Sequence, residues 1–258
     1  MPRFSANLSM LYSELPFLDR FAAAAADGFG AVEYVGAYEH EPALLRQLLD
    51  DNGLEQALFN LPAGDWAAGE RGIACHPDRI EEFRQSVETA IIYARATGCK
   101  RVNCLAGIAL PGHERAALEA TLIDNLRYAA PRFGEAGIML LLEPINAGDI
   151  PGFLINSSAD YERIAATVGH DNLYLQYDFY HMQVVQGDLL RTFARLQSRI
   201  AHVQIADLPG RHEPGTGEIN YPNIFAALDS AGYSGWVGAE YRPLAGTSEG
   251  LGWLAPWR

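Results

Sequence analysis

Lysine is almost absent from this chain. Of the nineteen basic residues among 258, eighteen are arginine, and Lys100 is the single lysine. Lys100 opens a predicted strand, so in a barrel it would lie at the end opposite the active site. Mechanisms that need a buried lysine amine, such as Schiff-base aldolase and pyridoxal phosphate chemistry, are therefore disfavoured. The phosphate-binding loop of nucleotide enzymes, G-x-x-x-x-G-K-[ST], is absent as well.

Positive charge is scarce in general. Nineteen Lys and Arg residues stand against thirty-two Asp and Glu residues, which gives a formal net charge of -13. A surface of this sign repels the phosphate backbone of DNA or RNA, so the sequence predicts no nucleic-acid partner.

Cysteines and long apolar runs are also rare. The three cysteines, Cys75, Cys99 and Cys104, cannot all pair and lack metal-ligand spacing, so we expect reduced thiols, with Cys99 and Cys104 packed around a strand. No apolar run approaches the roughly 20 residues of a membrane helix, and the first residues lack a basic-then-apolar signal region. These features predict a soluble, cytoplasmic protein with no membrane partner.

One sequence pattern repeats along the chain: an amphipathic stretch, a glycine, and then a short run of Val, Ile, Leu or aromatic residues. Each glycine has the position of a helix C-terminal residue, so each unit indicates a helix followed by a strand. The predicted strands are residues 4–10, 31–35, 55–59, 101–105, 138–142, 173–177, 200–206 and 236–240. The predicted helices are residues 17–27, 43–52, 79–97, 114–136, 159–168, 189–199 and 224–231.

Strands and helices that alternate in this way predict an α/β fold, a single (β/α)₈ TIM barrel domain over residues 1–258. The alternative is an open doubly wound sheet, but no G-x-G-x-x-G motif follows a strand. Two glycine-containing connections, residues 61–77 and 208–222, follow strands and would lie on the catalytic face; the first carries Trp66 and is the expected lid. Residues 250–258 are expected to pack on the barrel or on another subunit, so a homo-oligomer is possible.

Oxygen-bearing side chains stand at the ends of the last four predicted strands: Glu143, Asp178, Gln204 and Glu240. Taken singly, each could be an ordinary strand end that meets solvent. Neighbouring barrel strands lie about 4.8 Å apart, so four such side chains converge on a space the size of an ion. Three carboxylates there repel one another unless a cation lies between them.

The donor types indicate which cation is expected. Two Glu, one Asp and a Gln carbonyl are all oxygen donors, which suit Mg²⁺ or Mn²⁺ better than Zn²⁺. The nearest nitrogen donors are His181 and His202. We interpret His202 as a buried, hydrogen-bonded core residue. His181 lies past the strand end, where it either reaches a substrate oxygen or is a plain loop residue.

The loop after the seventh strand carries the expected cations for an anionic substrate, Arg211 and His212, because a barrel often holds an acid group near strands seven and eight. The alternative is a solvated arginine paired with Glu213 or Glu218. Glu33 lies inside the second predicted strand, where an unpaired charge is costly, so we expect a structural ion pair there.

Several segments resemble one known family. They are AHVQIA at 201–206, PGRHEP at 209–214, GEINYP at 217–222, FSANLSM at 4–10 and EGLGW at 249–253. In these segments the sequence closely resembles the hydroxypyruvate isomerases of the xylose-isomerase-like barrel superfamily, and the resemblance runs from end to end. Related sugar 3-epimerases commonly carry a histidine at the strand-seven ligand, whereas this chain has Gln204, as hydroxypyruvate isomerases do.

The resemblance implies a divalent cation held by Glu143, Asp178, Gln204 and Glu240, with Glu143 and Glu240 as the acid and base. It implies conversion of hydroxypyruvate, a small anionic 2-oxo acid, to tartronate semialdehyde (2-hydroxy-3-oxopropanoate) through an enediolate, which needs a base, an acid and a cation. A four-carbon 2-oxotetronate is the alternative substrate, since loops set the pocket length.

Other function classes stay open at this stage. They are a sugar 3-epimerase, a metal-dependent phosphodiester hydrolase like the apurinic endonucleases, and a non-catalytic barrel that binds carbohydrate acids. The hydrolases hold several zinc ions on many histidines, which does not match an oxygen-rich site on an acidic protein. Only an assay separates the binding barrel from the isomerase.

Overall fold

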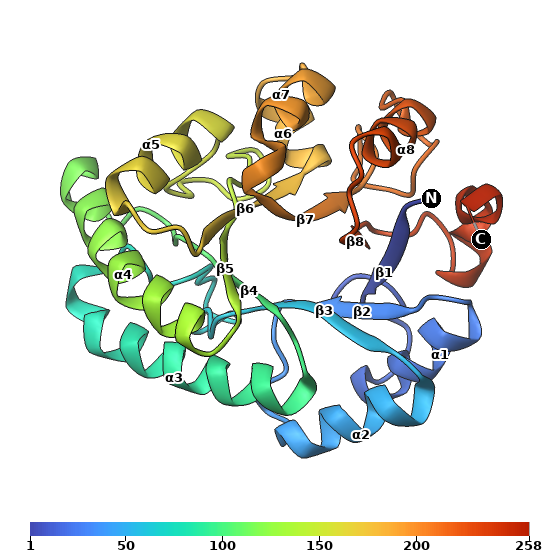
Figure 1. Ribbon diagram of the computed structural model, residues 1–258, viewed down its shortest axis with the longest axis horizontal. Coiled ribbons are helices and arrows are strands. Elements are labelled where there is room, and N and C mark those ends of the chain that lie inside the picture. Colours follow the sequence, from blue (N-terminus) through green and yellow to red (C-terminus); the bar gives the residue numbers. More distant parts are fainter. Residues whose placement is uncertain (258) are drawn as a thin grey trace.

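A computed structural model describes residues 1–257. Eight parallel strands close into a barrel in sequence order, with helices around the outside, so the predicted (β/α)₈ barrel is confirmed (Figure 1). The strands are β1 (Arg3–Asn7), β2 (Ala31–Tyr34), β3 (Glu55–Asn60), β4 (Arg101–Cys104), β5 (Met139–Leu142), β6 (Leu173–Asp178), β7 (Ile200–Ile205) and β8 (Trp236–Ala239).

The α-helices connect each strand to the next. They are α1 (Arg20–Ala26), α2 (Pro42–Asn52), α3 (Ile80–Thr97), α4 (Arg115–Glu135), α5 (Ser158–Val168), α6 (Phe179–Val185), α7 (Leu189–Leu196) and α8 (Tyr221–Ser230). 3₁₀ helices span Phe17–Asp19, Pro77–Arg79, Gln197–Arg199 and Ser248–Trp257. The main core lies between strands and helices, where Leu49, Phe83 and Leu122 are shielded from solvent.

Glycine ends several helices as the sequence predicts. Gly53 follows α2 with φ of 64°, and Gly98 follows α3 with φ of 76°. A residue with a side chain is strained in this left-handed conformation, whereas glycine adopts it freely. The chain therefore turns there and starts the next strand within a few residues.

Several elements differ from the sequence prediction in their bounds. The first strand ends at Asn7 rather than at residue 10, because the chain turns there and Leu11 N bonds back to Asn7 O. Helix α6 was not expected, since seven residues directly after a strand are too few for a helical periodicity. The predicted helix 189–199 ends as α7 at Leu196 and continues as a 3₁₀ helix.

The C-terminal segment packs on its own barrel. The Trp253 ring lies 5.2 Å from that of Phe4, and the Trp257 ring lies 5.0 Å from that of Phe225, so the segment covers the strand β1 and helix α8. The three cysteines are free and buried, as expected. No helix in residues 1–257 has the length and apolar character to cross a membrane.

Candidate active site

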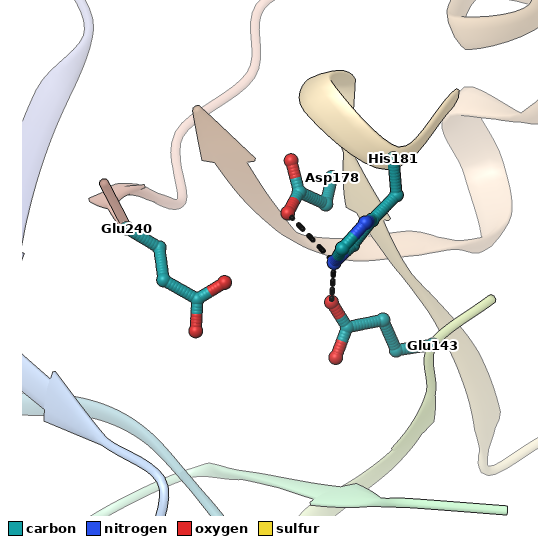
Figure 2. Close-up of side chains that lie close together, drawn as sticks. All are labelled: Glu143, Asp178, His181 and Glu240. Carbon is teal, nitrogen blue, oxygen red and sulfur yellow. Dashed lines mark ion pairs between the residues drawn. The ribbon is translucent and has the colours of Figure 1, made fainter. Parts of the chain in front are cut away.

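The strand ends meet at the mouth of the barrel. Atoms of Glu143, Asp178, His181 and Glu240 that could bind a metal all lie within 4.8 Å of one another. Figure 2 shows Asp178 and Glu143 on either side of the His181 ring, with Glu240 pointing toward them from across the mouth. Three carboxylates predicted from strands five, six and eight are therefore brought together, and a histidine joins them.

Asp178 and His181 are placed by one local feature, the start of α6. Asp178 is the last residue of β6 and the N-cap of α6, and its Oδ1 accepts a hydrogen bond of 2.8 Å from Tyr180 N. The other oxygen, Oδ2, is buried and has no hydrogen-bond partner within residues 1–257. His181 follows one helical turn later, so its ring lies beside that free oxygen, with Nε2 3.5 Å away.

Each of the two glutamates is held by an asparagine from a neighbouring strand. Asn103 Nδ2 on β4 donates to Glu143 Oε2 at 3.1 Å. Asn7 Nδ2 on β1 donates to Glu240 Oε1 at 3.0 Å. Because an amide nitrogen can only donate, each asparagine holds one carboxylate oxygen. The other oxygen of Glu143 lies 3.9 Å from His181 Nε2, and the other oxygen of Glu240 accepts from Arg211.

Burial and nearby negative charges raise the pKa values of all three carboxyl groups. Burial and the charges of Glu240 and Asp178 hold the pKa of Glu143 well above its ordinary value. Burial raises the pKa of Glu240 to about 8 and that of Asp178 to about 6, against the opposing effect of Arg211. A cation among the groups would lower these values, so the site gains electrostatic stability from positive charge.

Arg211 supplies one positive charge at the mouth. Its Nη2 donates to Glu240 Oε2 at 2.5 Å and lies 3.7 Å from Asp178 Oδ2, while Nη1 lies 3.3 Å from Asp149 Oδ2. Arg211 lies in the loop after β7 and has a positive φ of 59°, a backbone conformation uncommon for a residue other than glycine. The guanidinium, expected to meet a substrate acid group, is thus surrounded by the protein's own carboxylates.

The proton position on His181 follows from its neighbours. Asn146 Oδ1 accepts from Asp149 N at 2.8 Å, so Asn146 Nδ2 is the group that faces His181 Nδ1, at 2.7 Å. Nδ1 therefore accepts, and the proton of the neutral ring lies on Nε2, which faces Asp178 and Glu143. Burial also lowers the pKa of His181 well below its ordinary value, which keeps the ring neutral. His181 is a neutral hydrogen-bond donor at the mouth.

Gln204 lies below the carboxylates in a buried network centred on Glu33. Its Nε2 donates to Glu33 Oε1 at 2.8 Å, and its Oε1 accepts from Gln176 Nε2 at 2.6 Å. Glu33 Oε2 lies 2.7 Å from His202 Nε2, so the expected ion pair of Glu33 and the core role of His202 are confirmed. Gly238 on β8 leaves room for this carboxylate, because a Cβ there would overlap the Glu33 oxygens.

Asn7 links this network to the mouth. Its Nδ2 lies 3.2 Å from Glu33 Oε1 and 3.0 Å from Glu240 Oε1, so it bridges the two carboxylates. Ser5 Oγ donates to Glu33 Oε2 at 2.8 Å from the same strand. Glu33 therefore holds Gln204 directly, and it holds Glu240 indirectly, through Asn7.

A cavity of about 990 Å³ opens over the cluster. Glu143, His181, Arg211 and Glu240 line its floor, and Trp66, 43% exposed, lines it from the loop after β3 that the sequence predicts as a lid. His212 is not among the lining residues: its Nδ1 lies 2.7 Å from Arg242 O, so the structure does not bring it to the cluster.

Sequence reasoning overlooked Asn7, Asn103, Asn146 and Asp149. Asn7 ends β1 and Asn103 lies near the end of β4, but the predicted strands 4–10 and 101–105 run past these residues, so the strand-end signal that identified strands five to eight did not point to them. Asn146 and Asp149 lie in the loop after β5, whose path no local pattern predicts.

Comparison with known proteins identifies the family. The model of the xylose isomerase-like TIM barrel family matches residues 21–257. The chain belongs to this family.

Curated relatives refine this placement. The chain is 52% identical over its full length to a 2-oxo-tetronate isomerase of Cupriavidus necator, covering 99% of that protein. It is 51% identical to the hydroxypyruvate isomerase of Escherichia coli K12, over the whole of both chains. The resemblance to hydroxypyruvate isomerases is confirmed, and the protein is an isomerase.

Solved structures agree on the fold. A crystal structure of an AP endonuclease, family 2, from Brucella melitensis is 45% identical and superimposes with a TM-score of 0.97 over the whole of both chains. A 3-keto-D-glucoside 4-epimerase from E. coli, 21% identical, has a TM-score of 0.82 over 99% of each chain, which shows the same barrel fold.

The residues at the mouth fit a divalent cation. Asp178 Oδ2 is buried without a hydrogen-bond partner in the described chain, and it lies in the same cluster as oxygens of Glu143 and Glu240. Such an oxygen normally has a donor or a cation beside it. This family member therefore has a buried acidic group that could hold a metal ion.

Proposed function

We propose that this isomerase interconverts hydroxypyruvate and tartronate semialdehyde by two proton transfers with the substrate, one made by Glu143 and the other by Glu240. The observation that carries the proposal is the pairing of these residues. The two glutamates approach one space from β5 and β8, and a separate asparagine fixes each of them. A carboxyl group on either side of a bound substrate can serve two adjacent carbons.

The reaction needs two proton transfers at carbon. One glutamate removes a proton from C3 of hydroxypyruvate, which gives an enediolate, and the other returns a proton to C2. A hydroxyl proton moves from O3 to O2 in the same sequence, so the product is an aldehyde and nothing is oxidised overall. His181, a neutral donor at Nε2, supports this by hydrogen bonding to a substrate oxygen.

Glu143, Asp178, Gln204 and Glu240 are the proposed cation ligands, and Mg²⁺ or Mn²⁺ is the proposed ion because every donor is an oxygen. Once bound, the cation polarises the substrate oxygens and stabilises the negative charge of the enediolate. Gln204 Oε1 accepts a hydrogen bond from Gln176, and its second lone pair would be the one that binds the ion. Arg211 keeps Glu240 in place through its short hydrogen bond.

A longer 2-oxo acid is the second candidate substrate. The cavity of about 990 Å³ lies at the upper end of ligand sites and has room beyond a three-carbon acid. The 2-oxo-tetronate isomerase relative, at 52% identity, supports a four-carbon substrate equally well. The phosphodiester hydrolase is disfavoured, since one histidine alone joins the candidate ligand cluster in the described chain.

A direct assay tests the proposal. Purified protein with Mg²⁺ is incubated separately with hydroxypyruvate and with 2-oxotetronate, and the products are separated by ion-exclusion chromatography. We expect conversion of at least one acid, and comparison of kcat/KM identifies the preferred length. Absence of conversion of both acids would refute the proposed function.

A further inference from the structure

Arg211, the arginine at the carboxylate cluster, is engaged by the protein's own acidic groups. Four carboxyl groups, from Glu143, Asp149, Asp178 and Glu240, lie around Arg211. The Arg211 guanidinium already donates to Glu240, and its Nη1 contacts Asp149. Because these contacts already engage Arg211, a second positive group in the cavity wall is better placed to bind the carboxylate of an anionic substrate.

Two other arginines, Arg71 and Arg242, line the cavity, and within residues 1–257 Arg71 is the one whose guanidinium the protein holds in place. Arg71 lies in the loop after β3 and lines the same cavity as Glu143 and Glu240. Among the ion pairs of residues 1–257 none involves Arg71, and neither its Nε nor its Nη2 has a hydrogen-bond partner there. Nε and Nη2 form one edge of the guanidinium, which binds a carboxylate through two parallel hydrogen bonds.

The guanidinium of Arg71 is held in position by its own loop. Its Cζ lies 3.9 Å from the centre of the Trp66 ring, which covers one face. Nη1 donates to Trp66 O at 3.1 Å and to Glu70 O at 2.6 Å. The Trp66 ring therefore holds one face of the Arg71 guanidinium, and two carbonyl oxygens hold its Nη1. The edge formed by Nε and Nη2 stays free to bind an anion.

The loop that carries Arg71 is itself closed by hydrogen bonds. Gly72 N donates to Ala63 O at 2.9 Å, and Glu70 N donates to Asp65 O at 3.0 Å. Gly72, with φ of 100°, packs so tightly on Leu105 O that a Cβ would overlap it. A preorganised arginine loses little side-chain entropy when an anion binds.

We propose that Arg71, held by Trp66, binds the carboxylate of the 2-oxo acid and thereby sets the preference for anionic substrates. This inference rests on the proposed function for its substrate class. Arg211 then orients Glu240, and Arg71 holds the substrate end that does not react.

Substitution of Arg71 tests the proposal. Arg71→Gln should raise KM for hydroxypyruvate about 10- to 100-fold, the effect of losing hydrogen bonds to a charged group. Arg71→Lys should give an intermediate KM, since lysine keeps the charge without the paired donors. Arg84→Gln is the matched control, because it removes the same charge. Arg84 also stacks on an aromatic ring, that of Tyr128, but it lies outside the cavity lining. An unchanged KM in Arg71→Gln would overturn the proposal.

A binding measurement separates this inference from the proposed function. Pyruvate and neutral hydroxyacetone are titrated into the Mg²⁺-loaded protein and followed by ligand-observed NMR. Arg71→Gln should weaken pyruvate binding about tenfold or more and leave hydroxyacetone unchanged. Weakened pyruvate binding without turnover by the wild type would refute the function and keep the Arg71 site. Turnover with equal pyruvate binding in wild type and variant would refute the Arg71 site alone.

Discussion

Glu33→Gln should destabilise the protein strongly, although Glu33 lies below the catalytic cluster. The carboxylate is fully buried and receives hydrogen bonds from Ser5, Gln204 and Asn7, and it pairs with His202 at 2.7 Å. An amide keeps the shape but removes the charge and presents an NH₂ group to donors. Breaking a buried ion pair in this way costs about 3–5 kcal/mol of unfolding free energy.

The effect of Glu33→Gln should depend on pH. Burial by itself raises the pKa of Glu33. The charge of His202 and hydrogen bonds from His202, Gln204 and Ser5 outweigh this effect, so the pKa lies below its ordinary value of 4.5. A carboxyl group with a lowered folded-state pKa stabilises the fold above its unfolded pKa, and this contribution is lost as pH falls through the folded value. The destabilisation should therefore be complete at pH 7 and shrink as the pH falls below about 4.5.

Urea unfolding followed by circular dichroism at pH 7 and at pH 4 measures both effects. Glu81→Gln is the matched control, since Glu81 is 75% exposed, lies 4.0 Å from Arg84 and should change stability by less than about 0.5 kcal/mol. Equal stability of the two variants at pH 7, or a difference that does not shrink at low pH, would refute the role given to Glu33.

Three further predictions concern the mouth of the barrel. Glu143→Gln and Glu240→Gln should each lower kcat about 10²- to 10⁴-fold with the circular dichroism spectrum retained, and near wild-type turnover would exclude that residue as acid or base; metal content is measured on the same samples. Chelation by EDTA should lower the thermal unfolding midpoint, and Mg²⁺ or Mn²⁺ should restore it; tight zinc bound through His181 would contradict the oxygen ligands. Arg211→Lys should lower kcat, because an ammonium group cannot hold Glu240 and Asp149 together. Unchanged kcat and KM would show that Arg211 does not position Glu240 for the reaction.

The barrel could be predicted because its signals are local. Apolar runs and helix-ending glycines such as Gly53 report secondary structure residue by residue, and strand order then follows from the alternation. Helix α6 was not predicted, because its first turn depends on capping by Asp178, and seven residues give too short a pattern. Its start is what brings His181 to the cluster.

The sequence predicts the carboxylates of the site but not the hydrogen-bond partners of Arg211 and Gln204. Glu143, Asp178 and Glu240 share a rule, the end of a strand, which places them together in any barrel. The partners of Arg211 could not be predicted, since Asp149 reaches it from another loop, and loop paths depend on the packed structure. The orientation of Gln204 likewise depends on Glu33 across the barrel.

Proton NMR of the reaction in D₂O tests the central claim most directly. The Mg²⁺-loaded protein is mixed with hydroxypyruvate in D₂O, and C2 of newly formed tartronate semialdehyde is observed at early times, with product incubated without protein as the control for spontaneous exchange. Proton transfer through an enediolate and two separate glutamates predicts deuterium at C2 of the product. Absence of product, or product that carries the original C3 proton at C2, would contradict the account.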